Sequence, residues 1–504
     1  MISEHVEAQE DTPLSSCDLV VAVDPDPNTI RRAFELLRPR GAFYAEWRDP
    51  GQRASMLQML QGSGLDVLGS YWAWPDPESG STRLWVPLDA VGALRYVREA
   101  PTLSFIPGRF GVRSPVLALH RLRMSRRLAS PTPMCTIALK AADAARGHSV
   151  PGHSTPKEPA LTAIPEAVAS ALVESNVIPP VDGSGVVSKK AFFWMLLTPG
   201  RRSISKVVGL AFREPSTEPM AVIKLPRIPE AIPALKKEAD VLNALHRSRK
   251  TPIKGVPRVL FSEERDGMQM LGLTYLPGVP LWIQLRRSTY RSLAHRVTKW
   301  LADLAGESQP VDRSLWGARL VDATLETFSS QYGDVLEKED LQKAGDVLNR
   351  LDSLPIVFEQ RDLGPWNVLV APDGSIGVLD WESGEREGLP LLDLVYFLTF
   401  QAFFHKRAMG SGRFVEVYRK LMQPSSFVGR IFSECQIRYA KRLDMPASTM
   451  HPLRLLTWMI HSRSEYVHLS DDLGGTPPPE ALRDGLFYRL WREELAHGDR
   501  VPTL

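Results

Sequence analysis

The chain has 504 residues, of which 43% are hydrophobic and 24% are charged. This length allows roughly two to four domains, and the hydrophobic content is sufficient for a large buried core. The formal net charge is +3 at pH 7. A charge this small does not indicate nucleic-acid binding on its own.

Three cysteines, Cys17, Cys135 and Cys435, are far apart in the sequence and form no C-x-x-C pair. A disulfide framework or a structural zinc site is therefore not expected. The low cysteine content agrees with a protein of a reducing compartment. Residues 1–16 are acidic and polar, unlike a secretory signal. The most apolar later run, residues 391–404, is too short to cross a bilayer. We therefore expect a cytoplasmic protein without a membrane segment.

The first part of the chain predicts a strand, a helix and a second strand. Residues 18–24 (DLVVAVD) form a strand pattern, residues 29–37 have apolar positions at helical spacing, and residues 42–47 (AFYAEW) form another strand pattern. With the R-P-R-G turn between them, they resemble the later half of a class I S-adenosylmethionine-dependent methyltransferase. The resemblance implies an α/β N-terminal half-Rossmann-like module within residues 1–130.

The cofactor loop of that family is rich in glycine and precedes this segment. None of the seventeen residues before Asp18 is a glycine, so we expect a truncated module that packs without transferring a methyl group. A methyltransferase completed by a partner chain is the alternative. Residues 71–75 (YWAWP) are aromatic, and we expect them in a core or an interface rather than around a ligand.

Residues 131–185 are dominated by Pro, Ala, Ser, Thr and Gly. This composition does not support a long helix or a central strand. We expect an inter-domain linker here, with one short helix possible at residues 165–175.

Residues 186–277 predict a small lobe rich in strands. Two strands, residues 191–197 and 207–212, are joined by a turn that contains Gly200 and Ser203. The next strand pattern (AVIK) ends in Lys224. Glu238 follows fourteen positions later, on a predicted helix.

Three side chains that carry a carbonyl oxygen recur between residues 358 and 382, namely Asp362, Asn367 and Asp380. Apolar runs after Asn367 and before Asp380 flank a Pro-Asp-Gly turn, which predicts a short hairpin. The hairpin would hold the three side chains close together. One carboxylate can orient an attacking hydroxyl, and a second carboxylate with an amide oxygen can hold Mg2+.

At these residues the chain resembles the aminoglycoside phosphotransferase and choline kinase family. The catalytic loop of that family reads H-x-D-x-x-x-x-N and is followed by a metal-binding Asp. A segment similar to the family's G-x-P-x-x-D-L begins at Gly388. Two residues depart from the pattern, because Gln360 replaces the histidine and Arg361 replaces a small residue. The histidine is thought to support the loop, so we expect an effect on rate rather than on reaction type.

The resemblance implies an α+β two-lobed protein-kinase-like fold with a large helical C-lobe. The N-lobe would span residues 186–277 and the C-lobe residues 278–504. It also implies ATP and Mg2+ as cofactors, with Asp362 as the catalytic base and with Asn367 and Asp380 as metal ligands.

The remaining expected nucleotide contacts also follow from the resemblance. Lys224 would pair with the α and β phosphates, and Glu238 would hold Lys224 in place. Gly200 and Ser203 belong to the turn that would cover the phosphates. The backbone near Tyr275 and Leu276 would meet the adenine edge; the expected contacts are thus Lys224, Glu238, Gly200, Ser203, Tyr275 and Leu276.

The predicted partner is a small-molecule hydroxyl substrate, such as a sugar, an aminoglycoside-like compound or a metabolite alcohol. In this family the later helices form the acceptor pocket, and Trp458, Tyr466 and Trp491 are candidates for its walls. Acidic residues there alternate with Arg and Lys, so no acidic surface for a polycation is evident. No nucleic acid, membrane or protein partner is expected. The alternative is a catalytically impaired pseudokinase-like binding or scaffold protein, which Gln360 and Arg361 favour.

Overall fold

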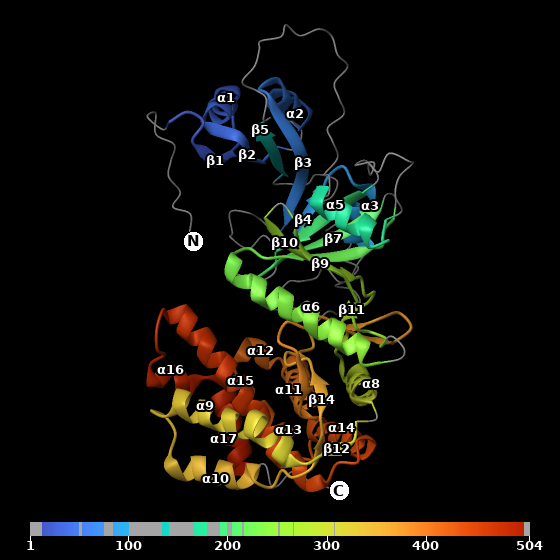
Figure 1. The fold of residues 1–504 in the computed structure, drawn as a ribbon, viewed down its shortest axis with the longest axis vertical. Helices are drawn as coiled ribbons and strands as arrows, with labels where there is room; N and C mark the ends of the chain where they lie inside the picture. Colours follow the sequence, from blue (N-terminus) through green and yellow to red (C-terminus); the bar gives the residue numbers. More distant parts are fainter. Residues whose placement is uncertain are drawn as a thin grey trace. The chain divides into compact units, whose positions relative to one another are not determined.

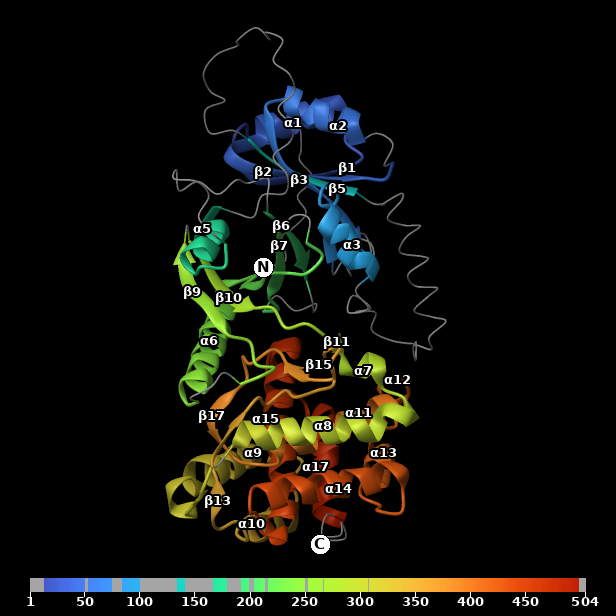
Figure 2. The ribbon, with the colours of Figure 1, turned by 90° about the vertical axis from the view of Figure 1, so that its right-hand side faces the viewer.

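The computed structural model describes residues 13–49, 53–74, 84–99, 134–140, 166–178, 192–198, 204–213, 216–249, 253–265, 267–306 and 308–497 (Figures 1 and 2). These residues divide into two compact units. Unit 1 contains the described residues up to residue 236 and those from 258 to 275. Unit 2 contains residues 237–257 and the described residues from 276 onward.

Ten described strands form one sheet in unit 1, in the order β1-β2-β5-β3-β4-β6-β7-β8-β10-β9. The first five strands in this order come from the N-terminal part of the chain. They are β1 (Cys17–Val23), β2 (Leu37–Trp47), β5 (Met134–Lys140), β3 (Leu65–Trp74) and β4 (Leu84–Pro87). β1 and β2 are parallel, whereas β5 is antiparallel to both of its neighbours, β2 and β3.

Two helices cover one face of this N-terminal part of the sheet, as Figures 1 and 2 both show. α1 (Pro27–Leu36) begins after Asp26, whose side chain accepts a hydrogen bond from Thr29 N and so satisfies a free backbone donor. α2 (Arg53–Gly62) buries Met56 and Leu60 in the same core. The predicted strand, helix and strand are confirmed as elements. Their Rossmann-like and methyltransferase-like character stays a prediction.

The linker expected at residues 131–185 is wrong at one place, because Met134–Lys140 forms β5, an inner strand of the sheet. Glu166–Glu174 forms α5, where a short helix was considered possible. The Pro-rich residues around β5 conceal it, although its own seven residues contain no Pro or Gly. Its pairing strands, β2 and β3, are distant in the sequence. The rest of this segment lies outside the described residues.

The second half of the sheet contains five strands from the residues expected to form the N-lobe, and three of them are the strands predicted above. They are successively antiparallel: β6 (Phe192–Leu197), β7 (Val207–Arg213), β8 (Ala221–Leu225), β10 (Met268–Thr274) and β9 (Val259–Arg265). The turn with Gly200 and Ser203 lies outside the described residues. β4 pairs with β6, so the N-terminal strands and these strands form a continuous sheet.

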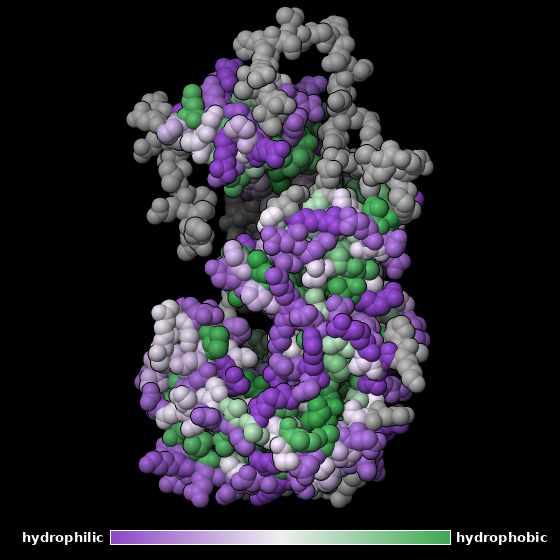
Figure 3. Space-filling model, viewed as in Figure 1, coloured by the Kyte–Doolittle hydropathy of each residue, from purple (hydrophilic) through white to green (hydrophobic). Residues whose placement is uncertain are grey.

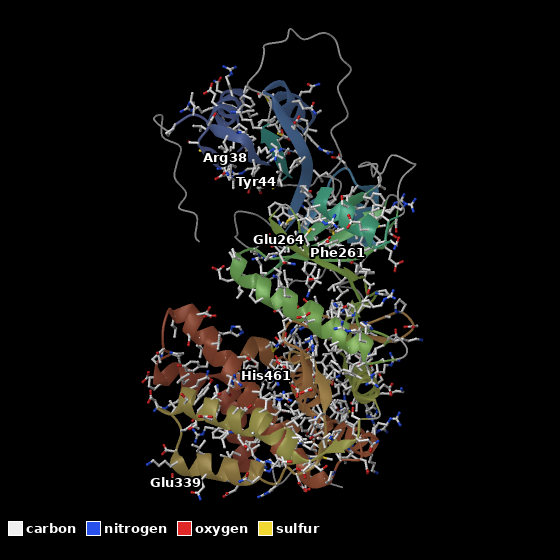
Figure 4. All side chains as sticks on the ribbon, in the orientation of Figure 1. Arg38, Tyr44, Phe261, Glu264, Glu339 and His461 are labelled. Atoms are coloured by element: carbon white, nitrogen blue, oxygen red, sulfur yellow. The ribbon has the colours of Figure 1, made fainter. Side chains whose placement is uncertain are left out.

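Each face of this second half is covered by a helix. Because side chains alternate along a strand, β6, β7 and β8 present apolar side chains to both faces of the sheet. α5 packs on one side, in a core that includes Phe261 of β9 (Figure 4). α3 (Val91–Glu99) packs on the other side, with Trp72 of β3 in the same core. Tyr71 and Trp72 are thus buried, in agreement with a core role for the aromatic run.

Unit 2 is mainly helical in its described residues. α6 (Ile232–Arg247) begins in unit 1 and continues in unit 2, and its side chains that face the viewer in Figure 3 are mostly hydrophilic. The other helices are α7 (Leu281–Gln284), α8 (Arg287–Ala305), α9 (Ala323–Tyr332), α10 (Lys338–Leu348), α11 (Leu392–His405), α12 (Ala408–Ser411), α13 (Phe414–Leu421), α14 (Phe427–Arg442), α15 (Met450–Leu473), α16 (Pro479–Asp484) and α17 (Leu486–His497). In the part of the chain that the structure describes, no helix is long and apolar enough to cross a membrane.

The helices of unit 2 pack around α11 and α15. Both are buried along much of their length, and α15 contacts α9, α10, α11 and α17. Trp458 on α15 and Trp491 on α17 are fully buried, so they belong to the core and are not walls of a pocket. Tyr466 is partly exposed and remains a candidate.

Short strands of unit 2 form small sheets beside these helices. They are β11 (Val279–Pro280), β12 (Pro310–Val311), β13 (Leu354–Pro355), β14 (Val357–Glu359), β15 (Val368–Val370), β16 (Ile376–Val378) and β17 (Glu385–Gly388). β15 pairs with both β11 and β16, and β14 pairs with β17.

Candidate active site

A short hairpin brings the polar side chains of residues 358–382 together. β15 and β16 pair in antiparallel register, and the turn between them contains Gly374 with a φ of 81°, a conformation that suits glycine. At the open end of the hairpin, Leu379 N donates a hydrogen bond to Asn367 O at 2.9 Å. Asn367 therefore lies beside the chain segment that carries Asp380.

The carboxylate of Asp362 is held by donors on both of its oxygens. Asn367 Nδ2 donates to Oδ2 at 2.9 Å and also to the backbone oxygen of Asp362 at 2.9 Å. The hydroxyl of Tyr396 donates to Oδ1 at 3.1 Å. These contacts fix the orientation of the carboxylate relative to the hairpin and to α11.

The environment of Asp362 raises its pKa to about 6. Burial is the main cause, and the negative charge of Asp380 adds to it, while hydrogen bonds from Tyr396, Trp366 and Asn367 lower the pKa. Asp362 is therefore mostly ionised at neutral pH and is easier to protonate than an ordinary aspartate. A carboxylate in this state can accept a hydrogen bond from a hydroxyl and then take up its proton.

Gln360 connects Asp362 to the segment of Asp380. Its Oε1 accepts a hydrogen bond from Asp362 N at 2.8 Å, and its Nε2 donates to the backbone oxygens of Leu379 at 3.0 Å and Asp380 at 2.6 Å. The side chain is fully buried. Gln360 thus supports the loop, which is the role that the family resemblance assigns to histidine at this position.

Arg361 has a left-handed backbone, with a φ of 65°, and its side chain is directed to other carboxylates. Its Nε donates to Glu359 at 2.7 Å, and its guanidinium lies 3.5 Å from Glu385. Backbone N–H groups of Gln360 and Arg361 both donate to Asp393, at 2.7 and 2.8 Å. The replacement of a small residue by Arg361 is therefore accommodated through ion pairs, not through contact with Asp362.

Asp393 holds this bend from the first turn of α11. Its pKa is raised to about 7, because burial and the charge of Glu359 outweigh the two backbone hydrogen bonds that favour the carboxylate. Asp393, the aspartate of the G-x-P-x-x-D-L segment, thus shapes the loop before Asp362 through these two backbone hydrogen bonds.

Three acidic side chains lie close together next to the hairpin. One oxygen each of Glu238, Asp380 and Glu382 lies within 4.8 Å of the others. Glu238, which is buried, also accepts a hydrogen bond from Trp381 N at 3.2 Å. Carboxylates at this spacing repel each other unless a cation or protons intervene.

These residues fit a divalent metal ion with oxygen ligands. Carboxylate and amide oxygens are the ligands that Mg2+ prefers, and the Asn367 amide directs its nitrogen to Asp362, which leaves its oxygen for another partner. The sequence suggested Asn367 and Asp380 as metal ligands, which stays a prediction, and did not suggest Glu382. The signal was its position two residues after Asp380. Glu238, expected next to Lys224, lies with the two acidic residues in unit 2, and its pairing with Lys224 stays a prediction.

The ring of Tyr396 stacks on the imidazole of His461. The rings of Tyr396 and His461 are 4.1 Å apart and nearly parallel, at 23°. His461, on α15, is labelled in Figure 4. Burial lowers the pKa of His461 to about 3, so the imidazole is neutral at physiological pH. Sequence reasoning missed both residues, although Tyr396 lies three residues after Asp393 and hence on the same face of α11.

The residues expected around the nucleotide are only partly described. Lys224 is buried in β8, where it pairs with Leu271 of β10 and Val208 of β7. Tyr275 directly follows β10, and burial together with the neighbouring Tyr96 raises the pKa of its hydroxyl. Leu276 belongs to unit 2.

Comparison with known proteins gives a family for the region that contains the hairpin. Residues 212–421 match the model of the phosphotransferase enzyme family. A search of curated proteins found no match.

Solved structures similar to this chain include aminoglycoside phosphotransferases. APH(4)-Ia is 12% identical, with a TM-score of 0.38 over 61% of this chain and 95% of that one. The ternary complex of APH(2")-IIa with streptomycin and ATP is 13% identical, with a TM-score of 0.37 over 65% and 98%. APH(3'')-Id from Streptomyces rimosus is 13% identical, with a TM-score of 0.33 over 66% and 98%.

The family match, not these distant structures, decides the assignment. It runs from the end of β7 to α13 and includes Lys224, the hairpin and Asp393. Residues 212–421 therefore match the phosphotransferase enzyme family, and they contain antiparallel strands together with helices α6 to α13.

Proposed function

We propose that this chain transfers the γ-phosphoryl group of ATP to a hydroxyl group of a small molecule. The observation that carries the proposal is the arrangement around Asp362, inside the phosphotransferase family match. The carboxylate is oriented by Asn367 and Tyr396 and has a pKa near the pH at which it would work.

Asp362 orients the acceptor hydroxyl and receives its proton. Each carboxylate oxygen has two lone pairs. Asp362 can therefore accept a hydrogen bond from the substrate hydroxyl in addition to those from Tyr396 and Asn367. Its orientation is fixed before the acceptor binds, which removes part of the entropic barrier to attack. Phosphoryl transfer requires little covalent chemistry from the protein, so orientation and charge supply most of the catalysis.

Asn367 and Asp380 hold Mg2+ in this proposal, and Glu382 and Glu238 are further candidates for ligands. The metal ion supplies positive charge that neutralises the phosphates. Lys224 is proposed to contact the phosphates, together with the turn of Gly200 and Ser203. The backbone of Tyr275 and Leu276 is proposed to contact the adenine; the proposed nucleotide contacts are thus Lys224, Gly200, Ser203, Tyr275 and Leu276.

The acceptor is a sugar, an aminoglycoside-like compound or another metabolite alcohol. A pseudokinase-like scaffold remains the second candidate, on the basis of the two departures from the family pattern. The contacts of Gln360 and Arg361 weaken that candidate, because both residues stabilise the loop of Asp362.

The metal assignment is tested by measuring ATP binding with and without Mg2+, by a method that detects millimolar dissociation constants, such as saturation-transfer NMR. Asp380→Ala should weaken Mg2+-dependent binding by at least about tenfold. Asp373→Ala is the matched control, because Asp373 lies in the turn of the same hairpin and caps Ser375. Equal binding by wild type and Asp380→Ala would contradict the metal assignment.

The catalytic assignment needs a separate variant. Asp362→Asn should retain Mg2+-dependent ATP binding and lose phosphoryl transfer to every acceptor that wild type accepts in a screen of sugars, aminoglycosides and amino alcohols. Undiminished transfer by Asp362→Asn would exclude Asp362 as the catalytic base.

A further inference from the structure

The face of the sheet that carries Lys224 has a defined set of neighbours. Strand pairing places Lys224 between Val208 of β7 and Leu271 of β10. Two residues earlier on the same side of β8, Val222 lies between Leu210 and Leu273. We call this surface the Lys224 face; it consists of Val208, Leu210, Val222, Lys224, Leu271 and Leu273.

The proposed nucleotide contacts fix where the base would lie on this face. Lys224 marks the phosphate end. β10 leads along the face to Tyr275, whose backbone marks the adenine end, and Thr274 pairs with Ala221 at that end of β8. A purine that reaches from one end toward the other must cover Leu210, Val222 and Leu273.

Two of these three residues, Leu210 and Val222, are already covered by α3. Tyr96 and Val97 of α3 belong to one buried core with Leu210 and Phe212, and Val222 packs against the same core. The rings of Tyr96 and Phe212 are 5.3 Å apart at 67°, an edge-to-face contact. Phe212 is fully buried and Leu210 is 8% exposed.

α3 also reaches the adenine end of the face. The hydroxyl of Tyr275 interacts with that of Tyr96. Tyr96 therefore contacts the sheet through its ring and the first residue after β10 through its hydroxyl. α3 belongs to the N-terminal part of the chain and is connected to the sheet by β4, which pairs with the edge strand β6.

We propose that α3 and the base of ATP compete for the Lys224 face, so that the N-terminal part of the chain inhibits nucleotide binding. This inference rests on the proposed function. It gives the N-terminal strands and helices a role that requires no methyl transfer. ATP binds only when α3 has left the face, and the apparent affinity is reduced by the fraction of molecules in that open state.

The strength of inhibition follows from the population of the open state. Minor conformations of proteins are commonly populated at about 0.1–10%. Removing the main contact of α3 should therefore tighten ATP binding by at least about tenfold. Tyr96→Ala is the variant of choice, because Tyr96 makes both contacts described above.

The experiment compares ATP binding in the presence of Mg2+ by full-length wild type, Tyr96→Ala and Leu60→Ala. Leu60 lies in the core between α2 and the N-terminal strands, so Leu60→Ala weakens the same part of the chain without uncovering the Lys224 face. We expect tighter binding for Tyr96→Ala and unchanged binding for Leu60→Ala. Equal dissociation constants for wild type and Tyr96→Ala would overturn the competition and leave the proposed function intact.

A second measurement needs no substitution. Amide hydrogen exchange of residues 91–97 in wild type should become faster when ATP and Mg2+ saturate the protein, because α3 is displaced. Unchanged or slower exchange of α3 in the ATP complex would overturn the competition even if Tyr96→Ala does not fold. Absence of ATP binding in both wild type and a folded Tyr96→Ala would overturn the proposed function and the competition together.

Discussion

Removal of the Tyr396 hydroxyl tests how the protein sets the protonation of Asp362. In Tyr396→Phe the ring and its stacking on His461 remain, and only the hydrogen bond to Asp362 Oδ1 is lost. That hydrogen bond lowers the pKa of Asp362, so its loss must raise the pKa further above the present value of about 6.

The size of the change follows from the energy of the hydrogen bond. A hydrogen bond to a charged group contributes about 1.5–3 kcal/mol, and 1.36 kcal/mol corresponds to one pH unit. We therefore expect the pKa of Asp362 to rise by about 1 or more. With a rise of about 1, the ionised fraction at pH 6 falls about fivefold, at pH 7 about twofold, and above pH 8.5 very little.

The assay is the pH dependence of kcat for phosphoryl transfer, once an acceptor has been found. The acid limb of the profile should move to higher pH in Tyr396→Phe, and the rate at high pH should approach that of wild type. Tyr488→Phe is the matched control, because it also removes a tyrosine hydroxyl that donates a hydrogen bond, in this case to Val335 O at 2.7 Å. A Tyr396→Phe profile that falls equally at every pH, with an unmoved acid limb, would refute the reasoning.

Three further predictions concern stability and metal binding. Because the pKa of Asp362 is raised, ionisation of Asp362 destabilises the folded state as the pH rises from about 4 to 6. Asp362→Asn should therefore raise the free energy of unfolding in urea by up to about 3 kcal/mol at pH 8. At pH 3.5 the variant and wild type should be equally stable. Gln360→Glu keeps the shape of the side chain but cannot donate to the two backbone carbonyls; we expect a loss of about 1–3 kcal/mol at pH 8, and unchanged urea denaturation would exclude this role. Glu382→Gln should raise the Mg2+ concentration needed for half-maximal ATP binding if Glu382 is a ligand, and an unchanged requirement would exclude it.

The hairpin could be predicted from the sequence because its signals are local. Two apolar runs, a Pro-Asp-Gly turn and polar residues at the strand ends lie within twenty residues of each other, and the structure has β15 and β16 at those positions. β5 could not be predicted in the same way. Its partners β2 and β3 are far away in the sequence, and the Pro-rich surroundings of β5 suggest a linker.

The supporting contacts of the candidate site are also non-local, and for that reason the sequence did not reveal them. Tyr396 reaches Asp362 across 34 residues, and His461 joins the stack from another helix. Gln360 illustrates the opposite error. Comparison with the family pattern suggested that Gln360 impairs the loop. In the structure its side-chain amide accepts one hydrogen bond and donates two within the loop.

Backbone strain around Asp362 explains why these supporting contacts are needed. Arg361 and Asp380 both have left-handed backbones, with φ of 65° and 60°, and neither is glycine. Such conformations cost on the order of 1–3 kcal/mol each and persist only where neighbouring contacts fix them. Asp393 binds the N–H of Arg361, and Gln360 binds the carbonyl of Asp380.

The strain and its support predict how the loop fails. Asp393→Asn replaces one acceptor oxygen with a donor, so a backbone N–H of Gln360 or Arg361 loses its partner. We expect a loss of about 1–3 kcal/mol in unfolding free energy. Phosphoryl transfer should fall more than ATP binding does, because the orientation of Asp362 depends on the bend. If both fall by the same factor, the bend contributes only stability and the strain has no role in positioning the catalytic carboxylate.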